Sequence, residues 1–586
     1  MKFRLSIFLL VYSNLLFSQQ FFTTKHYRQY SQTAIQKIEE INNSSYTFCT
    51  KPIEVDISRL IIQQNITIDL EDSIYELQPV EHRIRGIKNF SASYASIDKN
   101  VFMTISINDN DIIGTLFFAD NTYMIKTIAD EEYLLIDIDQ SSFPTEKDIE
   151  SQLMTSYTDD NSTITRTSIS TQGITTIDIL VLYTTDVAEA YPNIENIIYE
   201  AEAVSNLAFY NSDINCQFNI VYIGKTNYIE PKPYNKDNFS LNLKRFASVN
   251  DGFMDEVHRL RDTYAADVCV LMCYNEAYAG EAHTIKCDSQ SAFCVVHPNS
   301  ASSNISFAHE IGHLIGCRHD TYMDASTTPY SYGHGYININ KKWRTIMAYN
   351  NHCKDVGCYC KRLPYWSNPY ILYNGDVMGN IDMCNNAQVW RNRSPAVSSF
   401  RNYRDNLQID SLDLTNAKYG HLFGAQTICN SSVNVTTITA ENNIIFQAGN
   451  SIQLNPGFHI QNGAKFHAYI SSSPYSDTAS YSYQKRKNMA KSKSVCFRET
   501  QEMQVYPNPI SECSILYINL KNDINNIEIN IVDLMGNTIE TITSNDFLRA
   551  GEYHFPIDYS SLPHGAMFVT LMANHHIVSI TKIIHL

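Results

Sequence analysis

The sequence HEIGHLIGCRHD at residues 309–320 constrains the fold more than any other part of the chain. Residues four apart share one face of an α-helix, so His309 and His313 would direct two imidazoles toward one point. The other side of the helix has the spacing of a packed face, with Phe307, Ile311, Leu314 and Ile315. The pattern predicts a helix with one face in the core and one that binds a metal ion; solvated histidines are the alternative.

Glycine at position 316 predicts where this helix ends, because glycine adopts the left-handed conformation without a Cβ clash. The turn would bring His319 round as a third ligand, and three neutral imidazoles leave the fourth position of Zn²⁺ open for water. Glu310 follows the first ligand directly and is poorly placed to bind the same ion. We therefore expect Glu310 to act as the general base that takes a proton from the zinc-bound water.

The same residues carry a family resemblance. The stretch 309–320 looks like the extended zinc signature of the metzincin metalloendopeptidases, and Asp320 after the third histidine resembles their reprolysin (adamalysin) branch. Residues 346–349 resemble the methionine turn of that family, with Met347 beneath the zinc. The resemblance covers roughly residues 175–403. It implies an α/β metzincin-like catalytic domain, with a twisted sheet, helices and one catalytic Zn²⁺ on the active-site helix.

Three further expectations concern side chains around the metal. Tyr349 lies two residues after Met347, as in the astacin and serralysin branches, which makes it a candidate transition-state donor; core packing is the alternative. Met347 is expected to shape the floor of the site, since a thioether is a poor Zn²⁺ ligand. Asp320 is expected to hold local structure and is excluded from the ligands. A structural Ca²⁺ ion is an open alternative without motif support.

The N-terminus predicts export. Lys2 and Arg4 precede the apolar residues 5–17, the pattern of a secretory signal peptide, which we expect to occupy residues 1–18. No later stretch reaches the ~18 apolar residues of a membrane helix, so no transmembrane segment is expected. In an exported protein the 14 cysteines predict disulfide bonds. Ten of them form a cluster that suggests one stapled domain of unassigned pairing: Cys216, Cys269, Cys273, Cys287, Cys294, Cys317, Cys353, Cys358, Cys360 and Cys384.

Residues 19–173 are predicted to form a β-rich propeptide. Turn signals separate β-prone runs at 101–107, 112–118, 123–128 and 133–138, which indicates a meander. Residues 155–173 are dominated by Ser, Thr, Asp and Asn and predict an exposed, cleavable linker. Cys49 precedes all other cysteines and raises two alternatives: a thiolate that occupies the open zinc position, or an ordinary buried thiol.

The catalytic domain is expected to span residues 174–404. Apolar runs at 177–183, 216–223 and 268–272 alternate with helical spacing at 194–208 and 253–264, which is an α/β pattern. Residues 386–400 predict a later helix of the same domain. Beyond it, residues 425–470 predict a small β-strand stack, and residues 471–503 a solvated linker.

The last region, residues 504–586, alternates β-runs with turns and predicts a C-terminal β-sandwich. Tyr506-Pro507-Asn508-Pro509 and the turn motifs that follow it resemble the C-terminal sorting domain of the type IX secretion system. This resemblance implies the type IX secretion machinery as a partner. It also implies passage across the outer membrane and a secreted or cell-surface location. An ordinary β-sandwich adhesion module is the alternative.

The functional interpretation is a secreted zinc metalloendopeptidase, made as a zymogen, that hydrolyses peptide bonds of extracellular proteins. A formal net charge of −17 argues against nucleic acid as a partner, because phosphate binding needs a basic surface. The rival hypothesis is a non-catalytic, zinc-containing surface adhesin, which the presence of Glu310 disfavours. A zinc toxin with one host target would share all these residues. The sequence leaves the cleavage preference open.

Overall fold

The computed structural model of the 586-residue chain describes residues 19–147, 174–474 and 502–585, apart from short gaps. The gaps are 25–29, 58–59, 61–64, 71–72, 87–88, 119–120, 432–434, 507–513, 521–523, 534–537, 550, 558–561 and 574–575. The predicted signal peptide, the 155–173 linker, most of the 471–503 linker and Pro507–Pro509 lie outside the described residues. The chain divides into two compact units, Met1–Tyr483 and Gln484–Leu586.

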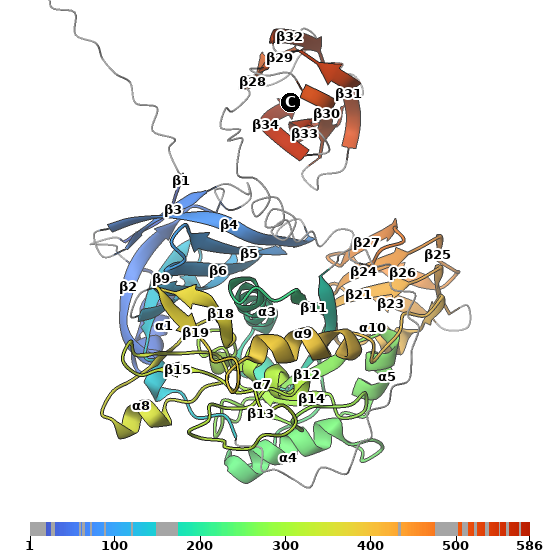
Figure 1. Cartoon of the computed structure of the whole chain (residues 1–586). Coiled ribbons are helices and arrows are strands. Elements are labelled where there is room, and N and C mark those ends of the chain that lie inside the picture. The colour runs from blue at the N-terminus through green and yellow to red at the C-terminus, as the bar shows by residue number, and fades with distance from the viewer. Residues whose placement is uncertain are drawn as a thin grey trace, which may run out of the picture. The chain divides into compact units, whose positions relative to one another are not determined.

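The first unit begins with a closed β-barrel of order β1-β2-β9-β8-β7-β6-β5-β4-β3 (Figure 1). Its strands are β1 (Gln19–Thr24), β2 (Thr47–Val55), β3 (Ile66–Leu70), β4 (Ser73–Gly86), β5 (Asn89–Ser96), β6 (Val101–Asn108), β7 (Asp111–Phe118), β8 (Asn121–Ala129) and β9 (Glu132–Ile138), with helix α1 (Gln32–Asn42) after β1. The four predicted strands are confirmed as β6 to β9. The meander closes because β1 pairs with both β2 and β3.

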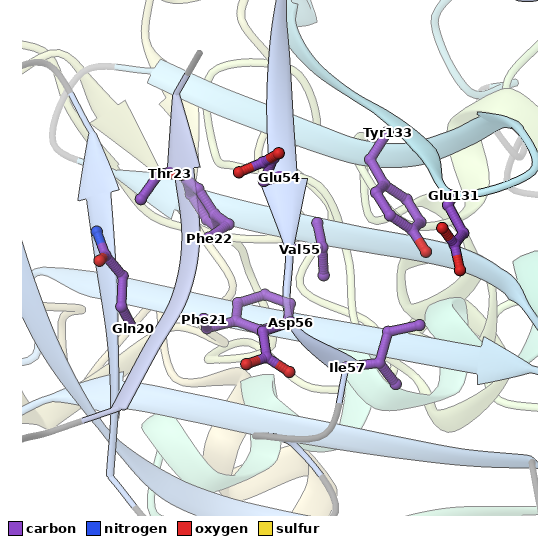
Figure 2. A pocket seen from close by; sticks show the side chains of 10 residues that line it. All are labelled: Gln20, Phe21, Phe22, Thr23, Glu54, Val55, Asp56, Ile57, Glu131 and Tyr133. Atoms are coloured by element: carbon purple, nitrogen blue, oxygen red, sulfur yellow. The ribbon is translucent and has the colours of Figure 1, made fainter.

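The barrel has a cavity of about 520 Å³ beside β1, the end of β2 and the start of β9. Figure 2 shows that Glu54, Asp56 and Glu131 place carboxylates around it, with Tyr133 nearby. The residues that line this cavity come from the barrel and the turn after β2, and none belongs to the predicted metal site. The cavity is therefore separate from the chemistry predicted for residues 309–320.

The second part of this unit is an α/β sheet of order β13-β14-β12-β10-β11-β21-β24-β27. Its first strands are β10 (Thr175–Tyr183), β11 (Cys216–Lys225), β12 (Val268–Met272), β13 (Gly280–Ala282) and β14 (Phe293–Val296). The main helices around it are α3 (Ile194–Asn211), α4 (Lys236–Ala247), α5 (Glu256–Thr263), α7 (Ser306–Ile315) and α9 (Asn386–Val397). The predicted strand–helix alternation is confirmed, with β10, β11, β12 and β14 parallel and β13 antiparallel at the edge.

Strands from the predicted β-stack, and one strand from the segment just before it, join this same sheet. β21 (Ala417–Gly424) pairs with β11, and β24 (Asn443–Ala448) and β27 (Lys465–Ile470) follow in parallel register. The smaller strands β20 (Asn406–Ile409), β22 (Thr427–Asn430) and β25 (Ser451–Gln453) form one sheet, and β23 (Thr436–Ile438) pairs with β26 (Phe458–Ile460). Leu422 and Phe446 pack in one hydrophobic cluster with Leu182 of β10. The region therefore extends the α/β core along one edge.

The barrel and the α/β sheet share buried contacts along α3. Phe102 and Phe117 of the barrel belong to the same hydrophobic cluster as the α3 residues. Glu202 of α3 is buried and pairs with Arg83, at 2.6 Å, and with Arg85, both from β4. The backbone N–H of Ile220 donates to the same carboxylate at 2.9 Å. Because a buried charge needs compensation, this group ties the barrel to the α/β layer.

The cysteines differ from the prediction of a heavily stapled domain. Within the described residues one disulfide forms, between Cys353 and Cys360, and the sulfur of Cys358 lies within 4.8 Å of the pair. Other members of the predicted cluster are buried thiols, including Cys269 inside β12 and Cys294 inside β14. They pack in the core as small apolar side chains, which is a common role of cysteine that its count alone does not reveal.

The second unit consists of two antiparallel sheets around one apolar core. One sheet has the order β28-β29-β32 and the other β31-β30-β33-β34. The strands are β28 (Glu502–Tyr506), β29 (Ile515–Leu520), β30 (Ile524–Val532), β31 (Thr538–Leu548), β32 (Gly551–Pro556), β33 (Gly565–Ala573) and β34 (His576–His585). Leu516 of the first sheet and Val569 of the second lie in the same cluster. Across the described parts of the chain, the helices are too short or too polar to cross a membrane.

The ion pair between the barrel and α3 gives a stability prediction. Glu202→Ala should lower the free energy of unfolding of the full chain by about 3–5 kcal/mol, because it leaves the buried Arg83 and Arg85 without this carboxylate. Urea unfolding of the full chain measures the change. Lys465→Ala, which removes an exposed pair with Asp109, is the matched control and should cost less than about 1 kcal/mol. Equal effects of the two substitutions would contradict the assignment.

Candidate active site

Helix α7 carries the predicted metal-binding sequence, and left-handed residues flank it at both ends. Ile305 has φ 60° and Gly316 has φ 119°. All residues of α7 are buried. A Cβ at position 316 would lie 2.9 Å from the ring of Tyr330, so space as well as conformation requires glycine there. The predicted end of the helix is confirmed.

The three histidines converge on one point. The Nε2 atoms of His309 and His319 are 3.2 Å apart, and those of His313 and His319 are 3.0 Å apart. The Nδ1 atom of His309 faces the carbonyl of Ile346, and that of His313 faces the carbonyl of Cys317, each at 3.0 Å. Because a carbonyl only accepts, the proton of each of these two rings is on Nδ1 and the Nε2 lone pair points inward.

This donor set fits a zinc ion. Tetrahedral Zn²⁺ with Zn–N bonds of about 2.0–2.1 Å would hold its nitrogens about 3.3–3.4 Å apart, close to the spacing found here. Burial lowers the pKa of His309 to about 3 and lowers the pKa of His313 well below its usual value. Both imidazoles are therefore neutral, which is the form that binds metal. The two inward lone pairs of His309 and His313 meet the Nε2 atom of His319 at one point, and these three histidines could hold a cation there.

The Glu310 carboxylate lies against the edge strand of the sheet. A Cβ on Gly280 of β13 would stand 2.6 Å from the carboxylate Oε1, so only glycine permits this approach. Burial raises the pKa of Glu310 well above its usual value, and the charges of Glu146 and Glu281 raise it further. The side chain therefore lies between α7 and β13, next to the histidine cluster.

The segment after β16 (Trp343–Arg344) forms the floor of the site. Met347 is fully buried, and a Cβ on Gly312 of α7 would meet its sulfur at 2.7 Å. The hydrogen bond from His309 to the carbonyl of Ile346 joins the same segment to the first histidine. Met347 thus lies directly under the helix that carries the histidines.

Tyr349 lies beside the histidines. Its ring centroid is 4.0 Å from that of His319 and 5.9 Å from that of His309. Its backbone N–H donates to Asp320 at 2.9 Å, and the backbone N–H of Tyr322 donates to the same carboxylate at 3.1 Å. Asp320 therefore holds two backbone segments in place, as its predicted structural role requires. The Tyr349 hydroxyl donates to a carbonyl of the N-terminal region, that of Glu146, at 2.9 Å.

Two other side chains, His334 and Cys49, are not among the converging imidazoles. His334 donates from Nδ1 to the carbonyl of His319 at 2.8 Å, so it supports the third histidine from behind. Cys49 lies on β2 of the barrel, with its sulfur 4.0 Å from the Asp137 carboxylate. The N-terminal residues that contact the site include Gln140, which bonds the backbone of Arg362, and residues 145–147.

Sequence reasoning missed one pair of residues at this site. Arg362, on β17 (Lys361–Arg362), is buried and contacts the Glu146 carboxylate through both terminal nitrogens, at 2.5 and 3.2 Å. Burial alone would raise the pKa of Glu146, but the charge of Arg362 outweighs it and holds that pKa far below its usual range. Neither residue belongs to a motif, and they are 216 positions apart in the chain.

Comparison with known proteins gives two family matches. Residues 174–367 match metallo-peptidase family M12. Residues 504–585 match the secretion system C-terminal sorting domain, which indicates export across the outer membrane or to the cell surface. The two matched regions correspond to the part of the chain that holds the histidine cluster and to the second compact unit.

Curated relatives agree with the first match. The chain is 37% identical over 292 residues to a peptidyl-Asp metalloendopeptidase of Xanthomonas campestris pv. campestris, covering 50% of this chain and 67% of the relative. It is 37% identical over 295 residues to a protein of the same name from Stenotrophomonas maltophilia (strain K279a), covering 50% of this chain and 68% of the relative.

A solved structure, that of metalloproteinase-II from Bacteroides fragilis, is similar at 12% identity with a TM-score of 0.30. The alignment covers 44% of this chain and 81% of that chain. The sequence relatives, the matched domain and the converging imidazoles together identify the family of this chain. The chain belongs to metallopeptidase family M12 and is a zinc metalloendopeptidase.

Proposed function

We propose that this enzyme is made as a zymogen, holds one zinc ion with His309, His313 and His319, and cuts extracellular proteins beside acidic residues. The convergence of three imidazoles carries the proposal, because it leaves a tetrahedral ion one position for reaction. The relatives' name, peptidyl-Asp metalloendopeptidase, supports the acidic preference. The sorting domain supports an extracellular substrate and a role for the type IX secretion machinery.

Each residue of the site has a role in this proposal. Zinc supplies Lewis-acid chemistry, which polarises the scissile carbonyl and makes water more acidic. Glu310 accepts the proton of the attacking water and passes it to the leaving amine. Tyr349 donates a hydrogen bond to the developing oxyanion once its hydroxyl is free of the Glu146 carbonyl; its contact with His319 supports this role. Met347 holds the floor beneath α7.

The proposal assigns the regions as follows. Residues 19–173 are the propeptide, 174–404 the metzincin-like catalytic domain, 425–470 a β-strand module, 471–503 a linker and 504–586 the sorting β-sandwich. Support for a propeptide comes from the contact of residues 145–147 with the site. Support for a removable tail comes from its separation as a compact unit. A signal peptide over residues 1–18 remains part of this proposal.

Glu310→Ala should keep zinc but lower kcat by at least ~10²-fold, because the general base is lost. The measurement is peptide hydrolysis by the metal-loaded, processed enzyme, with zinc content determined on the same sample. Glu441→Ala, at an exposed position, is the control and should behave as the unchanged enzyme. A zinc-loaded Glu310 variant with near-normal hydrolysis would reject this role. Absence of hydrolysis by the unchanged enzyme would favour the adhesin hypothesis.

His313→Ala should lose the zinc ion as well as activity, since two histidines cannot hold it tightly. Elemental analysis after dialysis against a weak chelator measures the occupancy. His352→Ala removes an imidazole that stacks on Tyr322 and is not one of the three converging histidines, so it should retain zinc. Full occupancy in the His313 variant would count against the proposed ligand set.

Deletion of residues 505–586 should leave the protein in the periplasm with its zinc and fold intact, because the tail forms a separate compact unit. Fractionation of cells that express the full-length and shortened chains measures the location, with a periplasmic marker in parallel. Efficient release of the shortened chain to the medium would contradict the sorting role.

A further inference from the structure

A short segment of the N-terminal region lies along the edge of the catalytic sheet. The backbone N–H of Ala279 donates to the carbonyl of Thr145 at 3.1 Å, and the N–H of Lys147 donates to the carbonyl of Gly280 at 3.0 Å. The Lys147 ammonium also pairs with Glu281 of β13 at 2.9 Å. Because β13 is an edge strand, it has unpaired backbone groups that an extended peptide can bind.

Glu146, in the middle of this segment, puts its carboxylate into a buried pocket. Besides Arg362, the Ser306 hydroxyl donates to it at 3.0 Å and the Asn304 amide donates at 3.3 Å. Glu146 is 3% exposed and Arg362 is 1% exposed. All three side chains that bind the carboxylate belong to the catalytic region, and the carboxylate itself belongs to the proposed propeptide. The side-chain donors of the pocket therefore all remain in the catalytic region when Glu146 leaves it.

The pocket adjoins the metal site. Ser306 begins the helix that carries His309, and the carbonyl of Ala348 accepts a hydrogen bond from Arg362 at 3.4 Å. Tyr349, the next residue, bonds the Glu146 carbonyl and lies against His319. Gly280, which binds Lys147, packs against the Glu310 carboxylate. A peptide that fills this pocket thus passes directly over the groups proposed to perform hydrolysis.

Arg362 has a strict requirement for an anion. A guanidinium stays charged, so leaving it buried without a partner costs several kcal/mol. Among the ion pairs of the described residues, Glu146 is the partner of Arg362. A two-nitrogen contact to a carboxylate also selects planar acids over amides of the same shape. When the propeptide leaves, the acidic side chain of a substrate can satisfy the same donors.

We propose that Arg362, Ser306 and Asn304 form the pocket that recognises the acidic substrate residue at the scissile bond, and that Glu146 fills it in the precursor as an internal surrogate. This deepens the proposed function and rests on it. The same pocket then sets specificity in the processed enzyme and latency in the precursor. Arg362 is the specificity-determining residue of this pocket, and Glu146 is the first side chain to occupy the pocket.

The specificity test compares two peptides that differ by Asp against Asn at the cleavage position. The unchanged, processed enzyme should prefer the Asp peptide by at least ~10²-fold in kcat/KM, because a site built around a hydrogen-bonded carboxylate rejects the amide. Arg362→Gln should bring that ratio close to one. Arg391→Gln, which removes a bond to the Asp213 carbonyl outside this pocket, is the control and should keep the full ratio.

The latency test needs no variant of the enzyme. A synthetic peptide of residues 139–149 should inhibit the processed enzyme competitively, and the same peptide with Glu146→Gln should inhibit at least ~10-fold more weakly. Equal inhibition by the two peptides would overturn the role of Glu146. A retained Asp preference in the Arg362 variant would overturn the role of Arg362 while the protease assignment stands. Failure of the unchanged enzyme to cut either peptide would instead reject the proposed function.

Discussion

The burial of one guanidinium organises the centre of this molecule. Arg362 is almost inaccessible to solvent, yet it is charged at any pH that the folded chain would meet. Its donors reach the carbonyl of Asn304, the carbonyl of Ala348 and the carboxylate of Glu146. These groups come from the start of α7, from the segment under the histidines and from the N-terminal region. One buried cation therefore fixes three parts of the chain relative to one another.

The orientation of the histidines also depends on hydrogen bonds between buried polar groups. His309 and His313 bond backbone carbonyls through Nδ1, so each ring has one orientation and one tautomer. The carbonyl that orients His309 belongs to Ile346, next to Met347, which packs under Gly312. Helix α7 is thus held from below by the segment that ends at Tyr349. The backbone of the fold therefore fixes the orientation of both imidazoles.

Patterns within a few residues predict much of the secondary structure and the candidate site. They do not predict which strands or charged residues pair over long distances in the sequence. The spacing of His309 and His313 and the glycine at 316 placed the site, because these features act within a few residues. Strands β6 to β9 and the β10–β12 alternation followed from hydrophobic runs for the same reason. Closure of the barrel needs β1 to pair with β2 and β3, and Arg362 needs Glu146 from 216 positions away. The cysteine count suggested disulfides because buried thiols leave no local signature.

The contact between the barrel and α3 has a consequence for the timing of activation. Phe102, Phe117 and the Arg83–Glu202 pair would persist after a cut between residues 147 and 174, since none of them depends on that peptide bond. Under the proposed activation, the immediate product of such a cut would be a nicked two-chain complex in which residues 145–147 still contact the catalytic region. The onset of activity would then depend on the dissociation rate of the barrel or on its further degradation. A more stable buried interface would therefore lengthen the interval between cleavage and activity.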